Sequence, residues 1–103
     1  MSPHKKIYCK AFGFDSGDYI GCSVCSSQAV DVHAIIADGM GGRPNKETHR
    51  IENLIALCRQ CHVKYGDKKH YKSFLFTQQR KVLIRKHLNY DETWIVEQIT
   101  KHG

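Results

Sequence analysis

The stretch "CSVCSSQAVDVHAIIADGMGGRPNKETHRIENLIALCRQCHVKYGDKK", residues 22–69, decides the fold. It contains two Cys-x-x-Cys pairs, Cys22 with Cys25 and Cys58 with Cys61. Two such pairs suit one tetrahedral Zn²⁺ ion, because each presents two thiolates at about 2.3 Å from the metal. The 32 residues between the pairs exceed the usual zinc-ribbon spacing. The sequence therefore predicts one zinc site from which a functional segment loops out.

Two disulfides, or buried thiols, are the alternatives to zinc. A two-residue gap strains a disulfide within either pair, and the chain carries no mark of secretion. Its first residues lead into a mixed, aromatic stretch rather than an apolar signal segment, and no run is long enough to span a membrane. Zinc leaves one of the five cysteines over, Cys9, which we expect to be a small buried residue. Four cysteines on zinc and one buried free thiol fit a cytoplasmic, bacterial or phage-encoded intracellular protein.

A chain of 103 residues predicts one domain whose limited core needs a staple such as zinc. We expect an N-terminal helical flank over residues 1–21, a zinc-containing core over residues 22–69 and C-terminal helices over residues 70–103. A structural zinc site contributes on the order of 10 kcal/mol to folding, so chelation should unfold the chain.

Hydrophobic periodicity predicts the elements around the zinc site. They are a short helix over residues 7–12, a strand over 28–36, a second strand over 48–51, a helix over 59–69 weakened at Gly66, a long helix over 71–88, and a last helix N-capped by Asp91. The long helix should bury Phe74, Leu75, Val82 and Leu88 and expose Arg80, Lys81, Arg85 and Lys86.

The net charge of +6 is unevenly distributed. Residues 43–86 carry twelve Lys and Arg against three acids, whereas the rest carries four Lys against seven acids. A segregated basic half beside a zinc site indicates a polyanionic partner, above all nucleic acid; a solvated basic face is the alternative. The residues expected to contact the DNA backbone are Arg43, Lys64, Lys68, Lys69, Lys72, Arg80, Lys81, Arg85 and Lys86.

The order of His33, Asn53 and His62 between and after the cysteine pairs resembles the HNH, or ββα-metal, nuclease family. The resemblance also rests on the glycine-rich loop and on Asn-Leu-x-x-Leu-Cys-x-x-Cys-His, and it covers residues 22–69. It implies an α+β fold, with a small ββα-metal core, a four-cysteine zinc site and flanking helices. The implied activity is single-metal hydrolysis of phosphodiester bonds in DNA, giving 5′-phosphate and 3′-hydroxyl ends.

The resemblance also implies a role for each matching residue. The four cysteines would hold structural Zn²⁺, and His33 and His62 would bind a catalytic divalent ion, Mg²⁺ or another. Asn53 would orient the general base. Ala34 falls where the family has the general-base histidine, and loss of a base typically costs about 10²–10⁴ in rate.

Three interpretations of Ala34 stay open. The chain is an engineered His-to-Ala variant, which we favour because the other site residues are intact, or a natural relative that is weak or inactive. In the third, the register shifts so that His33 is the base and Asp31 the metal ligand. That is the least attractive, because these two residues are two apart rather than adjacent.

Two other classes of function remain. A zinc-dependent DNA-binding module without nuclease activity predicts salt-sensitive DNA binding and no cleavage, and a protein-interaction zinc domain predicts weak DNA binding even at low salt. Taken singly, His33 could be an ordinary strand histidine and His62 a surface residue. Cutting both DNA strands would favour a homodimer, with residues 89–103 as the interface.

Overall fold

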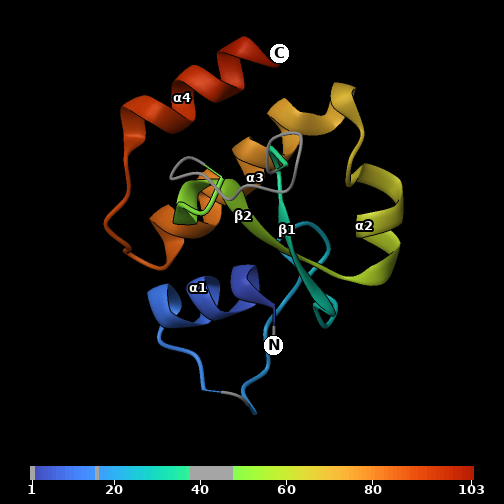
Figure 1. Ribbon diagram of the computed structural model, residues 1–103, viewed down its shortest axis with the longest axis vertical. Coiled ribbons are helices and arrows are strands. Elements are labelled where there is room, and N and C mark those ends of the chain that lie inside the picture. Colours follow the sequence, from blue (N-terminus) through green and yellow to red (C-terminus); the bar gives the residue numbers. More distant parts are fainter. Residues whose placement is uncertain (1, 16, 38–47) are drawn as a thin grey trace.

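Two short strands form the centre of the structure, and the helix after them lies at its edge (Figure 1). The computed structural model describes residues 2–15, 17–37 and 48–103. Its elements are α1 (Pro3–Phe12), β1 (Asp31–Ala34), the 3₁₀ turn η1 (Ile51–Asn53), β2 (Leu54–Leu57), α2 (Arg59–Tyr65), the 3₁₀ turn η2 (Lys69–Tyr71), α3 (Lys72–Arg85) and α4 (Glu92–Lys101). Together with four clustered cysteines, this arrangement confirms the predicted α+β fold with a ββα core.

The two strands pair antiparallel, with Ala34 of β1 opposite Leu54 of β2. Every residue of β2 is fully buried, with 0% of its surface exposed. Because neighbouring side chains in a strand point to opposite faces, Leu54 and Ala56 pack on one side of the sheet and Ile55 and Leu57 on the other. Strand β2 is therefore covered on both faces, and its pairing with β1 holds β1 against the core.

The predicted second strand at residues 48–51 is wrong. The chain there forms a turn that leads into η1, and the strand begins only at Leu54. The run Leu54–Leu57 is short and continuously apolar, which is the pattern of a strand buried on both faces rather than of an alternating one.

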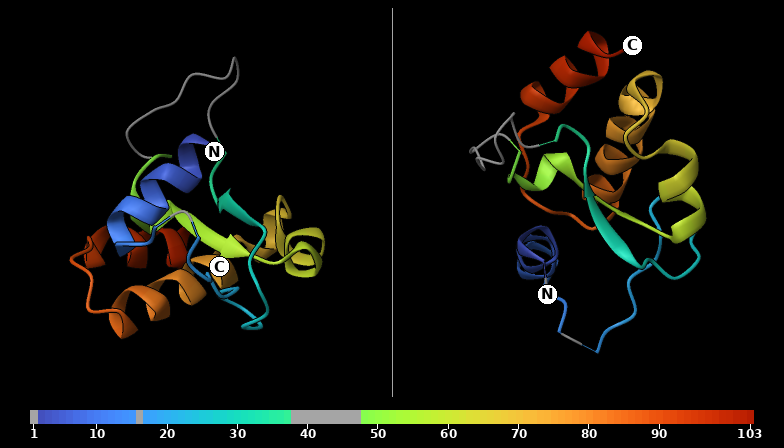
Figure 2. Two further views of the ribbon diagram at one scale, coloured as in Figure 1. Left: turned by 90° about the horizontal axis from the view of Figure 1, so that it is seen from below. Right: turned by 45° about the vertical axis from the view of Figure 1, so that its right-hand side comes forward.

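Two hydrophobic clusters flank the sheet, one toward α1 and one toward α3 and α4 (Figure 2). The smaller cluster consists of Tyr8, Val32, Ala34, Leu54 and Ala56. The larger one consists of Cys22, Ile35, Ile55, Leu57, Cys58, Cys61, Leu75, Phe76, Leu83, Trp94 and Ile95. Because three of the paired cysteines belong to it, the predicted zinc site is continuous with the main core.

The helix ends follow local capping signals. Helix α1 begins at Pro3, earlier than the predicted residue 7, because Ser2 caps it by accepting a 3.2 Å hydrogen bond from the Lys5 backbone N–H. Helix α2 ends before Gly66, short of the predicted residue 69. Helix α3 ends before the predicted residue 88, because His87 adopts a left-handed conformation with φ of 57°.

Helix α3 buries Leu75, Phe76, Gln79, Val82 and Leu83. This confirms two of the predicted buried residues, Leu75 and Val82, whereas Phe74 and Leu88 are only partly buried and pack at the edge of the main cluster. Lys81, Arg85 and Lys86 are exposed as predicted.

A buried carboxylate ties the start of α4 to the turn before β2. Glu52 is 5% exposed; its two carboxylate oxygens accept from the Arg50 Nε at 2.9 Å and from the Asp91 backbone N–H at 2.8 Å. Asp91 caps α4, as predicted, by accepting from the Trp94 N–H at 3.0 Å. The Arg50 guanidinium lies 4.3 Å from the centre of the Trp94 ring.

Replacing Glu52 by alanine is expected to lower the free energy of unfolding by about 2–3 kcal/mol. The change leaves the Arg50 guanidinium without its closest carboxylate and the Asp91 N–H without an acceptor. Urea denaturation of the zinc-loaded protein measures the loss. Glu97→Ala, which removes an exposed carboxylate of α4, is the matched control and should change stability by less than about 0.5 kcal/mol. Equal losses in the two variants would contradict a role for the Glu52 contacts.

Candidate functional site

The four paired cysteines converge on one point. Cys22 and Cys25 lie in a turn before β1, and Cys58 and Cys61 lie at the end of β2 and in the first turn of α2. Their sulfur atoms all lie within 4.8 Å of one another, and the Cys25 and Cys58 sulfurs are 3.5 Å apart. Sulfurs around a tetrahedral Zn²⁺ with 2.3 Å bonds lie about 3.8 Å apart. The four cysteines are thus positioned to form a zinc site.

The surroundings of these sulfurs favour the thiolate of Cys25 and disfavour that of Cys61. The backbone N–H groups of Val24 and Cys61 donate to the sulfurs of Cys22 and Cys58 at 3.5 and 3.4 Å. Hydrogen bonds from Ser27 lower the pKa of Cys25 to about 6, whereas burial raises the pKa of Cys61. None of the five cysteines, all of which the structure describes, forms a disulfide. The disulfide alternative is therefore not observed, and Cys9 is buried as expected.

A second group of potential metal ligands lies where β1 meets α2 and the turn after it. His33 projects from β1, His62 follows Cys61 in α2, and Asp67 lies in the turn after that helix. Their ligand atoms lie within 4.8 Å of one another, and the two imidazole rings are 5.0 Å apart between centroids. The structure thus brings together His33 and His62, both predicted site residues.

Asp67 is absent from the residues that the sequence predicts for this site. Its Oδ1 lies 3.9 Å from the Nε2 of His33. The signal for it is indirect: a carboxylate follows the glycine that ends the helix carrying His62. The sequence alone does not show that this carboxylate lies near His33, because that depends on the path of the turn.

Asp31 lies beside the pair of histidines as well. Its Oδ2 is 3.4 Å from the Nδ1 of His62, so a proton on Nδ1 would leave the other ring nitrogen, Nε2, able to bind a metal. A carboxylate at this position fixes the orientation and protonation of a ligating imidazole. Asp31 thus contacts His62, and it is not among the three residues whose ligand atoms lie within 4.8 Å of one another.

Burial sets the charge of His33. Its side chain is 7% exposed, and this burial lowers its pKa below the ordinary histidine value, although the carboxylate of Asp67 opposes the shift. At neutral pH the imidazole is therefore uncharged and carries a lone pair that can bind a cation.

Ala34 lies directly after His33 at the end of β1 and lines the same open cavity as the two histidines. The cavity measures about 330 Å³ and is bordered by Ser2, His4, Asp31, Val32, His33, Ala34, Ala37, His62 and Asp67. Ala34 itself is 8% exposed and contributes only a methyl group. At the position that the resemblance gives to the general base, the cavity therefore meets no proton-accepting side chain.

Asn53 acts on the backbone that follows β1. It is fully buried; its Nδ2 donates to the carbonyls of Ile36 and Thr48 at 3.0 and 2.9 Å, and its Oδ1 accepts from the Ile36 N–H at 2.8 Å. The backbone N–H of Ile35 also donates to the Asn53 carbonyl at 2.9 Å. Asn53 therefore anchors the backbone that leaves β1. It contacts the backbone just after position 34 rather than the side chain at that position.

Replacing Asn53 by alanine is expected to cost about 2–4 kcal/mol, since it leaves one N–H and two carbonyls of the buried backbone without their amide partner. Thermal and urea denaturation measure the loss, and Asn89→Ala, at an exposed position, is the matched control. Asn53 would have no anchoring role if the two variants unfolded alike.

The basic residues predicted to contact DNA divide into two groups. Six are exposed: Lys64, Lys68, Lys69, Lys81, Arg85 and Lys86. Two others already have partners in the protein, because the Nζ of Lys72 donates to the Ile35 carbonyl at 2.7 Å and the Nε of Arg80 donates to Glu92 at 2.6 Å. Arg43, with the loop over residues 39–44, lies outside the described residues.

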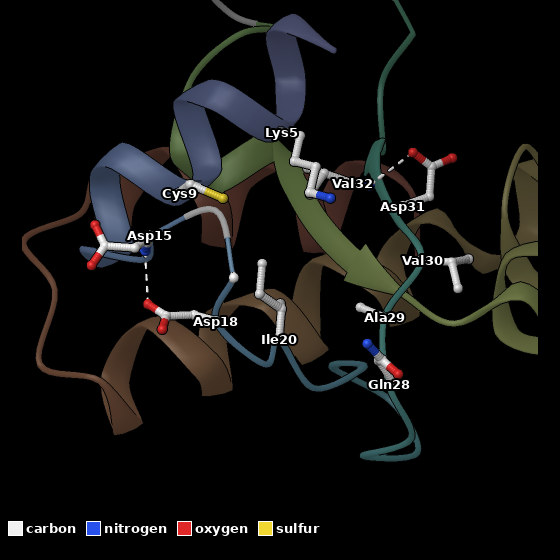
Figure 3. Close-up of a pocket in the computed structure, with 11 residues that line it drawn as sticks. Lys5, Cys9, Asp15, Asp18, Ile20, Gln28, Ala29, Val30, Asp31 and Val32 are labelled. Carbon is white, nitrogen blue, oxygen red and sulfur yellow. Dashed lines mark hydrogen bonds between the residues drawn. The ribbon is translucent and has the colours of Figure 1, made fainter. Parts of the chain in front are cut away.

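A second, smaller cavity of about 190 Å³ lies between α1 and the chain leading into β1 (Figure 3). It is lined by polar groups that include Lys5, Asp15, Asp18 and Gln28. The Asp15 N–H donates to Asp18 at 2.7 Å, so these aspartates serve the turn after α1. Asp31 borders both cavities, which places the metal-ligand cluster close to this turn.

Comparison with known proteins gives one match. The family model described as HNH endonuclease matches residues 22–68. No curated protein and no solved structure matches the chain at a significant level. Among the described residues, no helix is long and apolar enough to cross a membrane.

Proposed function

We propose that this chain, whose residues 22–68 match the HNH endonuclease model, is a DNA endonuclease that hydrolyses phosphodiester bonds with one divalent ion, in an inactive or weakened form. The expected products are 5′-phosphate and 3′-hydroxyl ends. The whole chain would act as one domain, with the flanking helices packed on the nuclease core. The observation that carries the proposal is that the rings of His33 and His62 lie 5.0 Å apart beside an open cavity that Ala34 also lines.

Each residue of the site has its own proposed role. His33 and His62 would hold the divalent ion, whose contribution is Lewis-acid stabilisation of the charge that develops on the phosphate and the leaving oxygen. Asp31 keeps the His62 ring in its orientation, and Asn53 fixes the backbone just beyond position 34. The exposed lysines and arginines of α2, α3 and the turn between them would contact the DNA backbone.

The missing step is proton transfer. Hydrolysis needs a group that takes a proton from the attacking water, and the methyl group of Ala34 cannot do so. The same observation favours the second candidate function, a zinc-dependent DNA-binding module without catalysis. The two functions differ in what a histidine at position 34 would do.

The test is nicking of supercoiled plasmid by the Ala34→His variant, compared with the double variant that also carries His62→Ala. The nuclease proposal expects cleavage by the first protein and none by the second, while both still bind the plasmid. Absence of cleavage by either protein, with salt-sensitive binding retained, would favour the binding module. Weak binding even at low salt would favour a protein-interaction domain.

A further inference from the structure

The turn that ends α2 is built around the ring of His62. The Gly66 N–H closes the helix by donating to the His62 carbonyl at 2.8 Å. A side chain at residue 66 would place its Cβ 2.4 Å from the His62 Cδ2 and 2.6 Å from its carbonyl oxygen. Glycine is therefore required for this close approach, which leaves the imidazole lying across the turn.

The next residue, Asp67, is directed by the same turn toward His33. It adopts a left-handed backbone conformation with φ of 58°, which aspartate tolerates better than most residues. Its backbone N–H donates to the Nε2 of His33 at 3.4 Å, and its carboxylate Oδ1 lies 3.9 Å from the same nitrogen. The side chain is nevertheless 76% exposed. The turn thus brings a carboxylate oxygen of Asp67 within 4.8 Å of the ligand atoms of both histidines.

We propose that Asp67 is the third ligand of a centre with two histidines and one carboxylate, and that this centre selects a first-row transition-metal cation such as Mn²⁺ over Mg²⁺. The inference rests on the proposed function, since it concerns the same divalent ion. The inference restricts the expected catalytic ion, previously Mg²⁺ or another divalent ion, to the first-row transition metals.

The donor set explains the preference. Mg²⁺ binds oxygen ligands in near-ideal octahedral geometry and keeps several waters, so it gains little from imidazoles. Imidazole nitrogen raises the affinity for first-row transition metals, of which Mn²⁺ is the weakest binder and the one that also suits carboxylate, and the single carboxylate offsets part of the cation's charge. The carboxylate of Asp31 at the far nitrogen of His62 raises the basicity of that ligand further.

The experiment measures Mn²⁺ binding to the full chain loaded with one equivalent of zinc, from loss of the electron paramagnetic resonance signal of free Mn²⁺. Mn²⁺ binds thiolates weakly, so its binding reports on the second centre rather than on the four cysteines. Asp67→Asn is expected to weaken Mn²⁺ binding by about 10–100-fold. Glu97→Gln, with the same change of charge on α4, should bind as the unmodified protein does. Displacing Mn²⁺ with Mg²⁺ should need at least about a 10-fold excess.

Three results would overturn the proposal. Unchanged Mn²⁺ affinity in Asp67→Asn, with affinity lost in His33→Ala, would remove Asp67 from the centre and leave the proposed nuclease site intact. Absence of Mn²⁺ binding to the unmodified chain would overturn this inference and the proposed metal site together. Displacement by Mg²⁺ at equal concentration would overturn the preference. Because Asp67 is exposed, the Asn variant should fold normally, which circular dichroism checks.

Discussion

Replacing Ala34 by histidine is expected to raise the rate of plasmid nicking by about 10²–10⁴-fold, the contribution that a positioned general base typically makes. The new imidazole would start at the border of the cavity of about 330 Å³ that Ala34 lines with His33 and His62, where the Ala34 methyl group also packs in the smaller hydrophobic cluster toward α1. The two histidines and the backbone contacts of Asn53 already lie around this position, so the proton acceptor is the part that the variant adds.

Supercoiled plasmid incubated with Mg²⁺ or Mn²⁺ measures this rate for the unmodified chain and for Ala34→His side by side. Ala34→Gln is the size-matched control, since its amide fills similar space but takes no proton at neutral pH. Equal cleavage by the unmodified chain and Ala34→His would show that another group is the base. The first residues to test would then be His33 and His4, which line the same cavity.

Removal of zinc is expected to abolish the fold. A structural zinc site contributes about 10–16 kcal/mol, which matches or exceeds the whole stability of an ordinary domain, about 5–15 kcal/mol. Cys22, Cys58 and Cys61 are themselves part of the main hydrophobic cluster, so loss of the metal also disrupts packing around β2 and α3.

A tight chelator, followed by far-ultraviolet circular dichroism and a thermal melt, measures the effect, and added zinc should restore the signal. Cys58→Ser should behave as the metal-free protein does. Cys9→Ala is the control, because Cys9 is buried outside the zinc cluster and its loss should leave the dependence on zinc unchanged. A melting curve that chelation does not alter would show that the core is sufficient without the metal.

The sequence predicted the features that depend only on residues close together in the chain. Two residues between paired cysteines, and a histidine directly after the last of them, specify ligands that the local backbone brings together whatever the rest of the chain does. The cap of α4 at Asp91 is equally local. These features therefore agree with the structure.

The features that the sequence did not reveal depend on tertiary contacts. Residues Leu54–Leu57 form a strand because both faces are covered, and a continuous apolar run does not identify itself as strand or helix. Asp67 meets His33 only because Gly66 lets the His62 ring cross the turn. Lys72 is drawn inward by the Ile35 carbonyl, which a count of charges does not show.

Helix α2 places Cys61 and His62 next to each other, so one short helical turn supplies a residue to the zinc site and another to the proposed second metal centre. Occupancy of the two clusters must then be thermodynamically linked: whatever factor zinc adds to the affinity of the second centre, the second metal adds to the affinity for zinc. A protein short of zinc would lose its second metal at concentrations that otherwise suffice. Zinc supply would therefore control how much of the chain can take up the second ion, as well as how much of it is folded.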